Sequence, residues 1–212
     1  TLPTVMVIAL HQRNIKRLLA YSGIAQAGYV MVGLAAITGE GTASLGELQR
    51  AIAEGQSGIM FFLAVYALAN LGAFITVIAV TDRTSSDEID SFSGLIRRAP
   101  VLTLVLTLCL VSLTGIPPLA GFFGKLYVFS AAVQAGYVWL VVIAVLNSAI
   151  SVYYYLRVMV IMYMREEEGL VDLEKAPAVS IAVGICGLLV ILLGLFPGML
   201  LDLARSSVLS LL

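Results

Sequence analysis

The sequence predicts an all-α fold, a polytopic bundle of transmembrane helices. Hydrophobic residues make up 60% of the 212 residues and charged residues only 12%, whereas an average soluble domain has about 25% charged residues. The mean hydropathy is +1.03. The apolar residues form long stretches, and about 20 of them suffice for a helix to cross roughly 30 Å of hydrocarbon. Because lipid offers the backbone no hydrogen bonds, these stretches should be helices.

The apolar stretches divide into about five complete spans and the end of a sixth. We expect the complete spans at Ile15–Ile37, Ala51–Val80, Val101–Ala135, Val138–Met164 and Pro177–Phe196. Thr1–Leu10 is apolar but covers only about half a membrane at roughly 1.5 Å per residue. We interpret it as the end of a helix that begins outside this sequence, and the chain as the C-terminal part of a longer protein.

Three polar or amphipathic segments join or follow these spans. Thr81–Pro100 has four apolar residues at helical spacing, which predicts a short amphipathic helix on the membrane surface. These four are Ile89, Phe92, Leu95 and Ile96. Arg165–Lys175 predicts a solvated link. The tail from Met199 to Leu212 is interpreted as an interfacial helix or as the frayed end of the last span.

The basic residues predict the orientation of the bundle. One side carries nine of the 12 lysines and arginines, the excess that is typical of the cytoplasmic side. These nine are Arg13, Lys16, Arg17, Arg83, Arg97, Arg98, Arg157, Arg165 and Lys175. The opposite side has Arg50 and Arg205, and Lys125 lies between the two sides.

Lys125 stands out because it lies about ten residues, or roughly 15 Å, from the outward end of its span. That depth is close to the membrane midplane, too deep for the side chain to snorkel to the outer surface. None of the 13 acids lies in the middle of a span. We therefore expect any partner of Lys125 to be water or a group outside this chain. A proton relay and a purely structural lysine both fit this position.

The same span should be interrupted shortly before Lys125. Pro118 lacks an N–H group and disfavours helical backbone at Pro117, and Gly115 adds flexibility beside them. A broken helix at membrane depth is tolerated where it lines a cavity or is buried in protein, and it marks the ion site in many transporters. The sequence therefore predicts one discontinuous span, broken at Gly115–Pro118.

Polar residues at helical spacing on three other spans suggest a path that continues from Lys125. They are Gln26 and Tyr29 on the first span, Tyr66 and Asn70 on the second, and Asn147, Ser151 and Tyr154 or Tyr155 on the fourth. Each set on its own is also typical of hydrogen bonding between membrane helices.

Other kinds of site find little support in the sequence. The formal charge of −1 and the lack of a basic stripe argue against a nucleic-acid partner. Cys109 and Cys186 lack the spacing of a redox pair or metal site, and His11 has no cluster of other ligands around it. We expect no cofactor and no metal in this chain.

Three stretches carry a resemblance to a known family. They are HQRNIKRLLAYSGIAQAGYVMVGLAA, GIPPLAGFFGKLYVF and NSAISVYYYLRVM, and they resemble the antiporter-like subunit N of bacterial NADH:quinone oxidoreductase, respiratory complex I. The resemblance implies that residues 1–212 are the second of two inverted repeats plus the last helix of a proton-translocating membrane domain. Its essential lysine on a discontinuous helix would correspond to Lys125, and the lysine of its KRLLAYS motif to Lys16, as a second relay or as a surface anchor.

The resemblance also implies the setting. The chain would be a non-redox subunit that couples quinone reduction to proton transport, in a multi-pass position in the bacterial plasma (inner) membrane. Its partners would be other membrane subunits of complex I, especially the neighbouring antiporter-like ones, with FMN, iron–sulfur clusters and quinone elsewhere in the assembly.

Departures from the family pattern define the alternatives. Related subunits often have histidine at the position of Gln26. The M-type subunit usually has glutamate where Lys125 stands, and the L-type subunit extends into a long lateral helix. A subunit of a multisubunit cation/proton antiporter is the alternative function, and a purely structural scaffold is a third.

Overall fold

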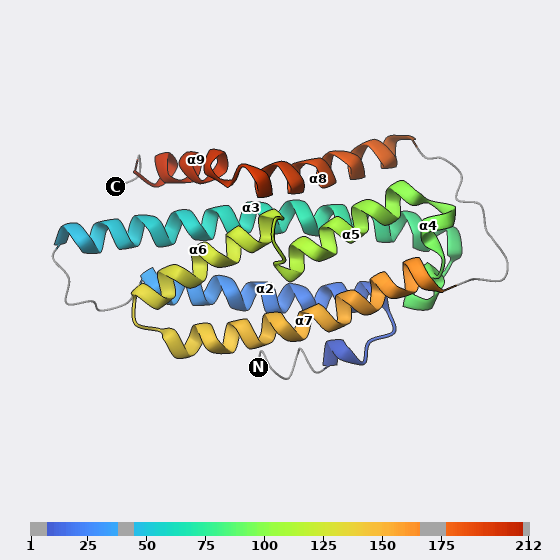
Figure 1. Ribbon diagram of the computed structural model, residues 1–212, viewed down its shortest axis with the longest axis horizontal. Helices are drawn as coiled ribbons and strands as arrows, with labels where there is room; N and C mark the ends of the chain where they lie inside the picture. The colour runs from blue at the N-terminus through green and yellow to red at the C-terminus, as the bar shows by residue number, and fades with distance from the viewer. Residues whose placement is uncertain (1–7, 38–44, 166–176, 210–212) are drawn as a thin grey trace.

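The computed structural model describes residues 8–37, 45–165 and 177–209, and its helices run side by side along the long axis of the molecule (Figure 1). The all-α prediction is confirmed. The elements are α2 (Ile15–Ile37), α3 (Leu45–Thr84), the 3-10 turn η1 (Ile89–Phe92), α4 (Leu95–Arg98), α5 (Pro100–Thr114), α6 (Ala120–Gln134), α7 (Val138–Met164), α8 (Pro177–Leu195) and α9 (Pro197–Leu209).

Four of these helices contain a stretch that is long and apolar enough to cross a membrane. The stretches are Ile15–Ile37, Gly55–Thr84, Val138–Met164 and Ala178–Leu195. The remaining predicted span consists of α5 and α6, two helices of 15 residues each that follow one another from end to end of the bundle (Figure 1). Helix α3 has 40 residues and is longer than predicted. At about 1.5 Å per residue it is longer than the roughly 30 Å of hydrocarbon that a span has to cross.

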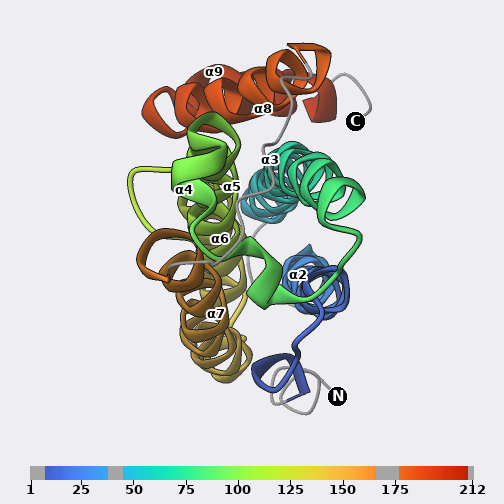
Figure 2. The ribbon, with the colours of Figure 1, turned by 90° about the vertical axis from the view of Figure 1, so that its right-hand side faces the viewer.

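Viewed along the helices, the bundle has α3, α5 and α6 in its middle (Figure 2). Helices α8 and α9 cover one side, and α2 and α7 lie on the other. Small residues allow close approach where lipid gives little driving force for association. A Cβ atom on Gly72 of α3 would lie 2.7 Å from the Sγ of Cys109 and 3.0 Å from the Cβ of Cys186. Helices α3, α5 and α8 therefore meet at this glycine.

The segment between α3 and α5 corrects one prediction. Instead of one amphipathic helix on the membrane surface, it forms the short elements η1 and α4. Gly94 separates them because its φ of +60° is left-handed, a conformation that ends a regular helix. Ile89, Phe92 and Leu95 are fully buried in the main core of the bundle. The helical spacing of these residues therefore reflects packing against protein.

This segment holds the basic end of the bundle together. The N–H of Ile15 donates to the carbonyl of Asp87 (2.9 Å), and the N–H of Ile89 donates to the carbonyl of Arg13 (2.7 Å). On the other side, the N–H of Gly94 donates to the carbonyl of Ile161 in α7 (3.3 Å). The start of α2 and the end of α7 are thus fixed to one loop, which positions the helices that carry the polar residues.

The tail forms a distinct helix, α9, which starts after a break at Phe196 and continues along the direction of α8 (Figure 1). Leu201 of α9 packs in a small core with Phe61 of α3 and Ala120 of α6. The described part of the tail, up to Leu209, is therefore a helix packed against the bundle, and the prediction of a frayed end is wrong for these residues. Residues 166–175 of the predicted link and the start of the chain, 1–7, lie outside the described residues.

Candidate functional site

The predicted interruption of the third hydrophobic span is confirmed, and Gly115 is the residue that ends α5. Its φ of +86° is left-handed, and its N–H donates to the carbonyls of Val111 and Ser112. The N–H of Ile116 also donates to the carbonyl of Val111 (3.3 Å), which completes a glycine C-cap. Pro117 and Pro118, joined by a cis peptide bond, lead the chain to the start of α6.

The end of α5 provides the ligands of Lys125. The last carbonyl groups of a helix have no partner within it and carry the negative end of its dipole. The Nζ of Lys125 donates to two of them, the carbonyls of Leu113 (3.1 Å) and Thr114 (2.7 Å). It also donates to the Oγ of Ser148 on α7 (2.8 Å). These three bonds use all three N–H groups of the ammonium.

Lys125 therefore has partners inside the chain, which corrects the expectation that they lie outside it. The side chain is only 6% exposed. Within the described residues it meets no carboxylate, as the positions of the acids predicted. Backbone carbonyl groups at the end of α5 stabilise the ammonium in place of a carboxylate. This explains how a lysine can be buried here without a counter-ion of full charge.

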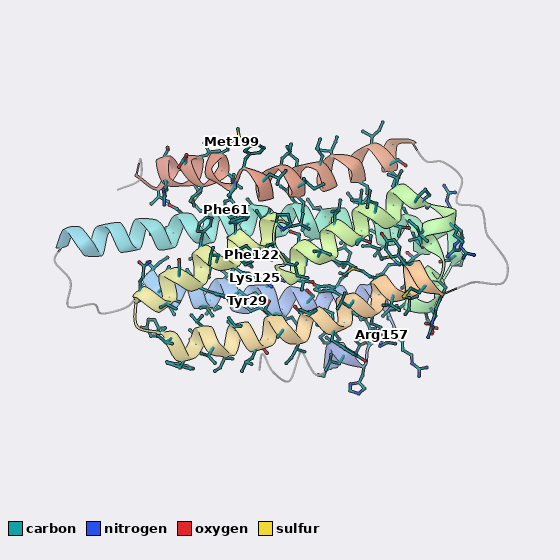
Figure 3. All side chains as sticks on the ribbon, in the orientation of Figure 1. Tyr29, Phe61, Phe122, Lys125, Arg157 and Met199 are labelled. Atoms are coloured by element: carbon teal, nitrogen blue, oxygen red, sulfur yellow. The ribbon has the colours of Figure 1, made fainter. Side chains whose placement is uncertain are left out.

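Two further residues shape the space around the ammonium. The Nζ lies 4.8 Å from the centre of the Tyr29 ring, a cation–π contact (Figure 3). A Cβ atom on Gly115 would approach the Cδ of Lys125 to 2.8 Å and its Nζ to 3.2 Å. Glycine at this position therefore serves both the left-handed backbone and the room that the lysine side chain needs.

Gln26 and Tyr66 border Lys125 on the side of α2 and α3. The Nε2 of Gln26 donates to the carbonyl of Leu113 (3.0 Å), the same oxygen that Lys125 binds. A small cavity of about 10 Å³ is lined by Gln26, Tyr66, Ser112 and Lys125, among others. This volume admits about one water molecule.

Further polar groups of α2 and α7 lie toward the basic end. Ser151 donates to the carbonyl of Ser148 (2.6 Å). The centres of the Tyr154 and Tyr155 rings lie 4.5 Å apart, with the ring planes tilted by 59°, and the hydroxyls of Tyr155 and Ser22 are hydrogen-bonded. The structure thus brings Tyr154 and Ser151 into one buried cluster with Ser22 and Tyr155.

Two residues of the predicted path, Asn70 and Asn147, are not among the hydrogen-bond partners of Lys125. Asn70 is half-buried and does not line the cavity beside the lysine. Asn147 is buried, and its Nδ2 has no hydrogen-bond partner among the described residues. The spacing of these residues along a helix predicted that they share a polar face with other residues. It could not predict which residues of other helices pack against that face.

Lys16 lies at the basic end of the bundle, and its bonding partner is not one of the polar residues around Lys125. Its Nζ forms an ion pair with Asp87 at 2.7 Å, and both side chains are about 40% exposed. Asp87 belongs to the loop that also binds the backbone of Ile15. The ion pair therefore joins the start of α2 to that loop.

Sequence reasoning missed Ser148 and Ser22. Ser148 is adjacent to Asn147, from which the helical spacing was counted, so attention fell on the neighbouring face of α7. The signal that was available is the three-residue spacing of Ser148 and Ser151. Ser22 precedes Gln26 by four residues, which is the same kind of signal.

No group of three or more histidine, cysteine or acidic side chains in the described parts of the chain could hold a metal ion. The fold and the site together define a class: a polytopic helical membrane protein in which a broken helix presents its end to a buried ionisable side chain. Discontinuous helices of this kind form ion sites in transporter folds.

Comparisons with known proteins make this class specific. The model of the NADH:quinone oxidoreductase/Mrp antiporter transmembrane family matches residues 4–151, and the chain belongs to this family. It is 42% identical over 207 residues to NADH-quinone oxidoreductase subunit N of Desulfitobacterium hafniense, which covers 97% of this chain and 42% of that protein. The chain thus spans less than half the length of this relative.

Solved structures agree with the fold. A chain of respiratory complex I from Thermus thermophilus with bound aureothin superimposes with a TM-score of 0.76 at 35% identity, over 95% of this chain and 42% of that one. A chain of the Mrp complex from Dietzia has a TM-score of 0.81 at 19% identity, over 98% and 45% of the two chains. The second likeness concerns the fold alone.

Proposed function

We propose that this chain is the C-terminal part of a proton-translocating membrane subunit of an NADH:quinone oxidoreductase, in which quinone reduction drives proton transport. The observation that carries the proposal is Lys125, an ionisable group held at the broken helix by the carbonyls of Leu113 and Thr114 and the hydroxyl of Ser148. Its relatives named subunit N support the assignment to this enzyme.

In this function Lys125 takes up and releases a proton. The carbonyl groups at the end of α5 stabilise the ammonium form in a place that is shielded from bulk water. A positive charge that arrives on a neighbouring group repels the ammonium, and this repulsion is strong where the surroundings are apolar. Loss of the proton leaves a neutral amine that still fits the same site. Energy would thus reach this subunit as a change of nearby charge.

The cluster of Ser22, Ser151, Tyr154 and Tyr155 lies between Lys125 and the basic end. We assign it, with Gln26 and Tyr29, to the inward part of the proton path. Residues 1–212 would be the second of two inverted repeats plus the last helix. FMN, iron–sulfur clusters and quinone would be held by other subunits, this chain would carry no redox group, and the assembly would lie in the bacterial plasma membrane.

A subunit of a multisubunit cation/proton antiporter is the second candidate. The family model covers such antiporters as well, and the fold resembles a chain of the Mrp complex. The two candidates share the fold and differ in their partners.

Purification and reconstitution of the full-length protein separate the two. A tagged protein should copurify with subunits that carry flavin and iron–sulfur clusters, and vesicles containing the assembly should pump protons when NADH and a quinone are added. Copurification with membrane subunits alone, together with sodium-driven proton movement and no response to NADH, would establish the antiporter instead.

Lys16→Ala should weaken assembly more than pumping. Its ion pair with Asp87 is partly exposed, and such pairs contribute about 0.2–1 kcal/mol to stability. We expect a small loss of assembled complex and near-normal proton pumping per assembled complex. Asp87→Asn should have the same effect because it removes the same pair. A fully assembled Lys16→Ala complex that no longer pumps would identify Lys16 as a relay group.

A further inference from the structure

A pocket of about 580 Å³ lies at the basic end of the bundle, between α7 and the chain just before α2. Its volume falls within the range of roughly 300–1,000 Å³ that is typical of ligand pockets. Three basic and three apolar or aromatic side chains of the described residues line it: His11, Arg13, Arg157, Leu10, Ile150 and Tyr153. The residues that bind Lys125 are not among them, so this pocket is separate from the Lys125 site.

Arg157 is unusual in this pocket because it belongs to an apolar helix. Helix α7 has 27 residues and is about 40 Å long, roughly 10 Å more than the hydrocarbon of a membrane. Val138–Val145 at its other end is entirely apolar, so the extra length projects at the basic end. Arg157 precedes the end of α7 by about 10.5 Å. It therefore lies near the boundary between the hydrocarbon and the lipid headgroups.

The bonds of Arg157 within the chain leave part of its guanidinium unused. Figure 3 shows Arg157 at the edge of the bundle, beside the first described residues of the chain. Its Nη1 donates to the carbonyls of Leu10 and Gln12, both at 3.4 Å, which is long for such a bond. Its Nε and Nη2 have no partner among the described residues. It meets no carboxylate there, whereas Arg165 at the same end pairs with Asp90 at 2.6 Å.

The pocket combines positive charge at one end with apolar surface at the other. Arg13 adds a second guanidinium, which is exposed and forms no ion pair within the described residues. On α7, Tyr153 and Ile150 precede Arg157 by four and seven residues and share its face of the helix. They lie about 6 Å and 10.5 Å deeper in the membrane than Arg157. The charges are thus at headgroup level, and the apolar wall is at the level of the acyl chains.

We propose that this pocket binds an anionic phospholipid of the leaflet at the basic end, with its phosphate on Arg157 and Arg13 and an acyl chain along Tyr153 and Ile150. The planar fork of a guanidinium matches a phosphate group, and basic pockets between membrane helices are typical headgroup sites. A soluble anion leaves the apolar wall uncovered, and a lipid without net charge leaves the two guanidinium charges unbalanced. The inference goes beyond proton transport and does not depend on it.

The test uses the full-length protein in its assembled complex, reconstituted into vesicles of phosphatidylcholine. A small fraction of phosphatidylglycerol carries a photoreactive diazirine on one acyl chain. Illumination should cross-link this lipid to α7 around Ile150 and Tyr153, and mass spectrometry of peptides locates the product. A phosphatidylcholine with the same diazirine chain, used in its place, should label this face about fivefold less, because the guanidinium groups favour a lipid with net negative charge.

Variants of the two arginines test the charges directly. Arg157→Gln and Arg13→Gln should each reduce labelling by phosphatidylglycerol about fivefold, and Arg157→Lys, which keeps the charge, should retain most of it. Arg165→Gln is the matched control at the same end, because Arg165 is paired with Asp90, and it should label normally. Native gels check assembly. If Arg157→Gln fails to assemble, Arg13→Gln decides, since the Arg13 side chain has no bond within the described residues.

Three results would overturn the lipid site. The first is equal labelling by the two lipids, or labelling by phosphatidylglycerol that the arginine variants leave unchanged. The second is no labelling of this face of α7, because another part of the full-length protein or a neighbouring subunit then covers the pocket. The third is displacement of the lipid by excess inorganic phosphate at constant ionic strength, which would identify a site for soluble anions instead.

Discussion

Lys125→Met should abolish proton pumping while the complex still assembles. Methionine fills a similar volume but cannot carry a proton. We expect NADH-driven pumping to fall by about a hundredfold or to the level of passive leak, as for loss of an acid–base group in catalysis. The measurement is proton movement per NADH oxidised in reconstituted vesicles, and native gels check assembly.

The structure explains why this variant should remain folded. The carbonyl of Leu113 keeps a hydrogen bond from Gln26, and the carbonyl of Thr114 keeps one from Ser148. Neither carbonyl is therefore left without a partner when the ammonium is removed, and the Ser148 hydroxyl keeps its bond to Thr114. The desolvation cost of the charge also disappears. Assembly failure of Lys125→Met would show that the lysine is needed for structure, and normal pumping would refute the relay.

Two other substitutions at the same position probe the chemistry. Lys125→Arg should pump weakly or not at all, because a guanidinium stays protonated and its planar fork differs from the ammonium in shape. Lys125→Glu should retain a part of the pumping, because a carboxylate also takes up and releases protons. Higher activity of arginine than of glutamate would indicate that charge alone matters at this site.

The sequence predicted those parts of the fold that depend on one helix at a time. The lengths of the apolar stretches placed α2 and α7 at the predicted residues, Ile15–Ile37 and Val138–Met164. Gly115 and the two prolines after it predicted the break, since their backbone preferences are local. The connection after α3 was predicted wrongly because the same spacing of Ile89, Phe92 and Leu95 fits a lipid surface and a protein core equally well.

Of the site, only the residue whose type is unusual at its position, Lys125, could be predicted from the sequence. Lys125 is conspicuous because a charge at membrane depth is costly. Its ligands are not, because two of them are backbone carbonyls that any sequence possesses, and the third is a serine among many. Which carbonyls face the lysine depends on how far α6 is displaced from the end of α5, a tertiary feature that no spacing encodes.

Because the start of α6 lies so close to the end of α5, Gly121→Ala should strongly disrupt the packing of these two helices. Gly121 lies in the first turn of α6, where its N–H donates to the Oγ of Ser112 (3.1 Å). A Cβ atom there would lie 1.8 Å from the carbonyl oxygen of Ser112, which belongs to the backbone of α5. The start of α6 and the end of α5 would have to separate, and overpacking of this kind typically costs about 1–3 kcal/mol.

This separation should also disturb the Lys125 site, because Leu113 and Thr114, whose carbonyls bind the lysine, directly follow Ser112. We expect a clear loss of assembled complex on native gels and a loss of pumping in the complex that remains. Gly184→Ala in α8 is the matched control, since nothing lies within 4 Å of a Cβ atom at that position. Alanine is about 1 kcal/mol better than glycine in an exposed helix, so the control should be neutral or slightly stabilising. If Gly121→Ala behaved like this control, the close approach of α6 to the end of α5, and with it the carbonyl cage of Lys125, would be refuted.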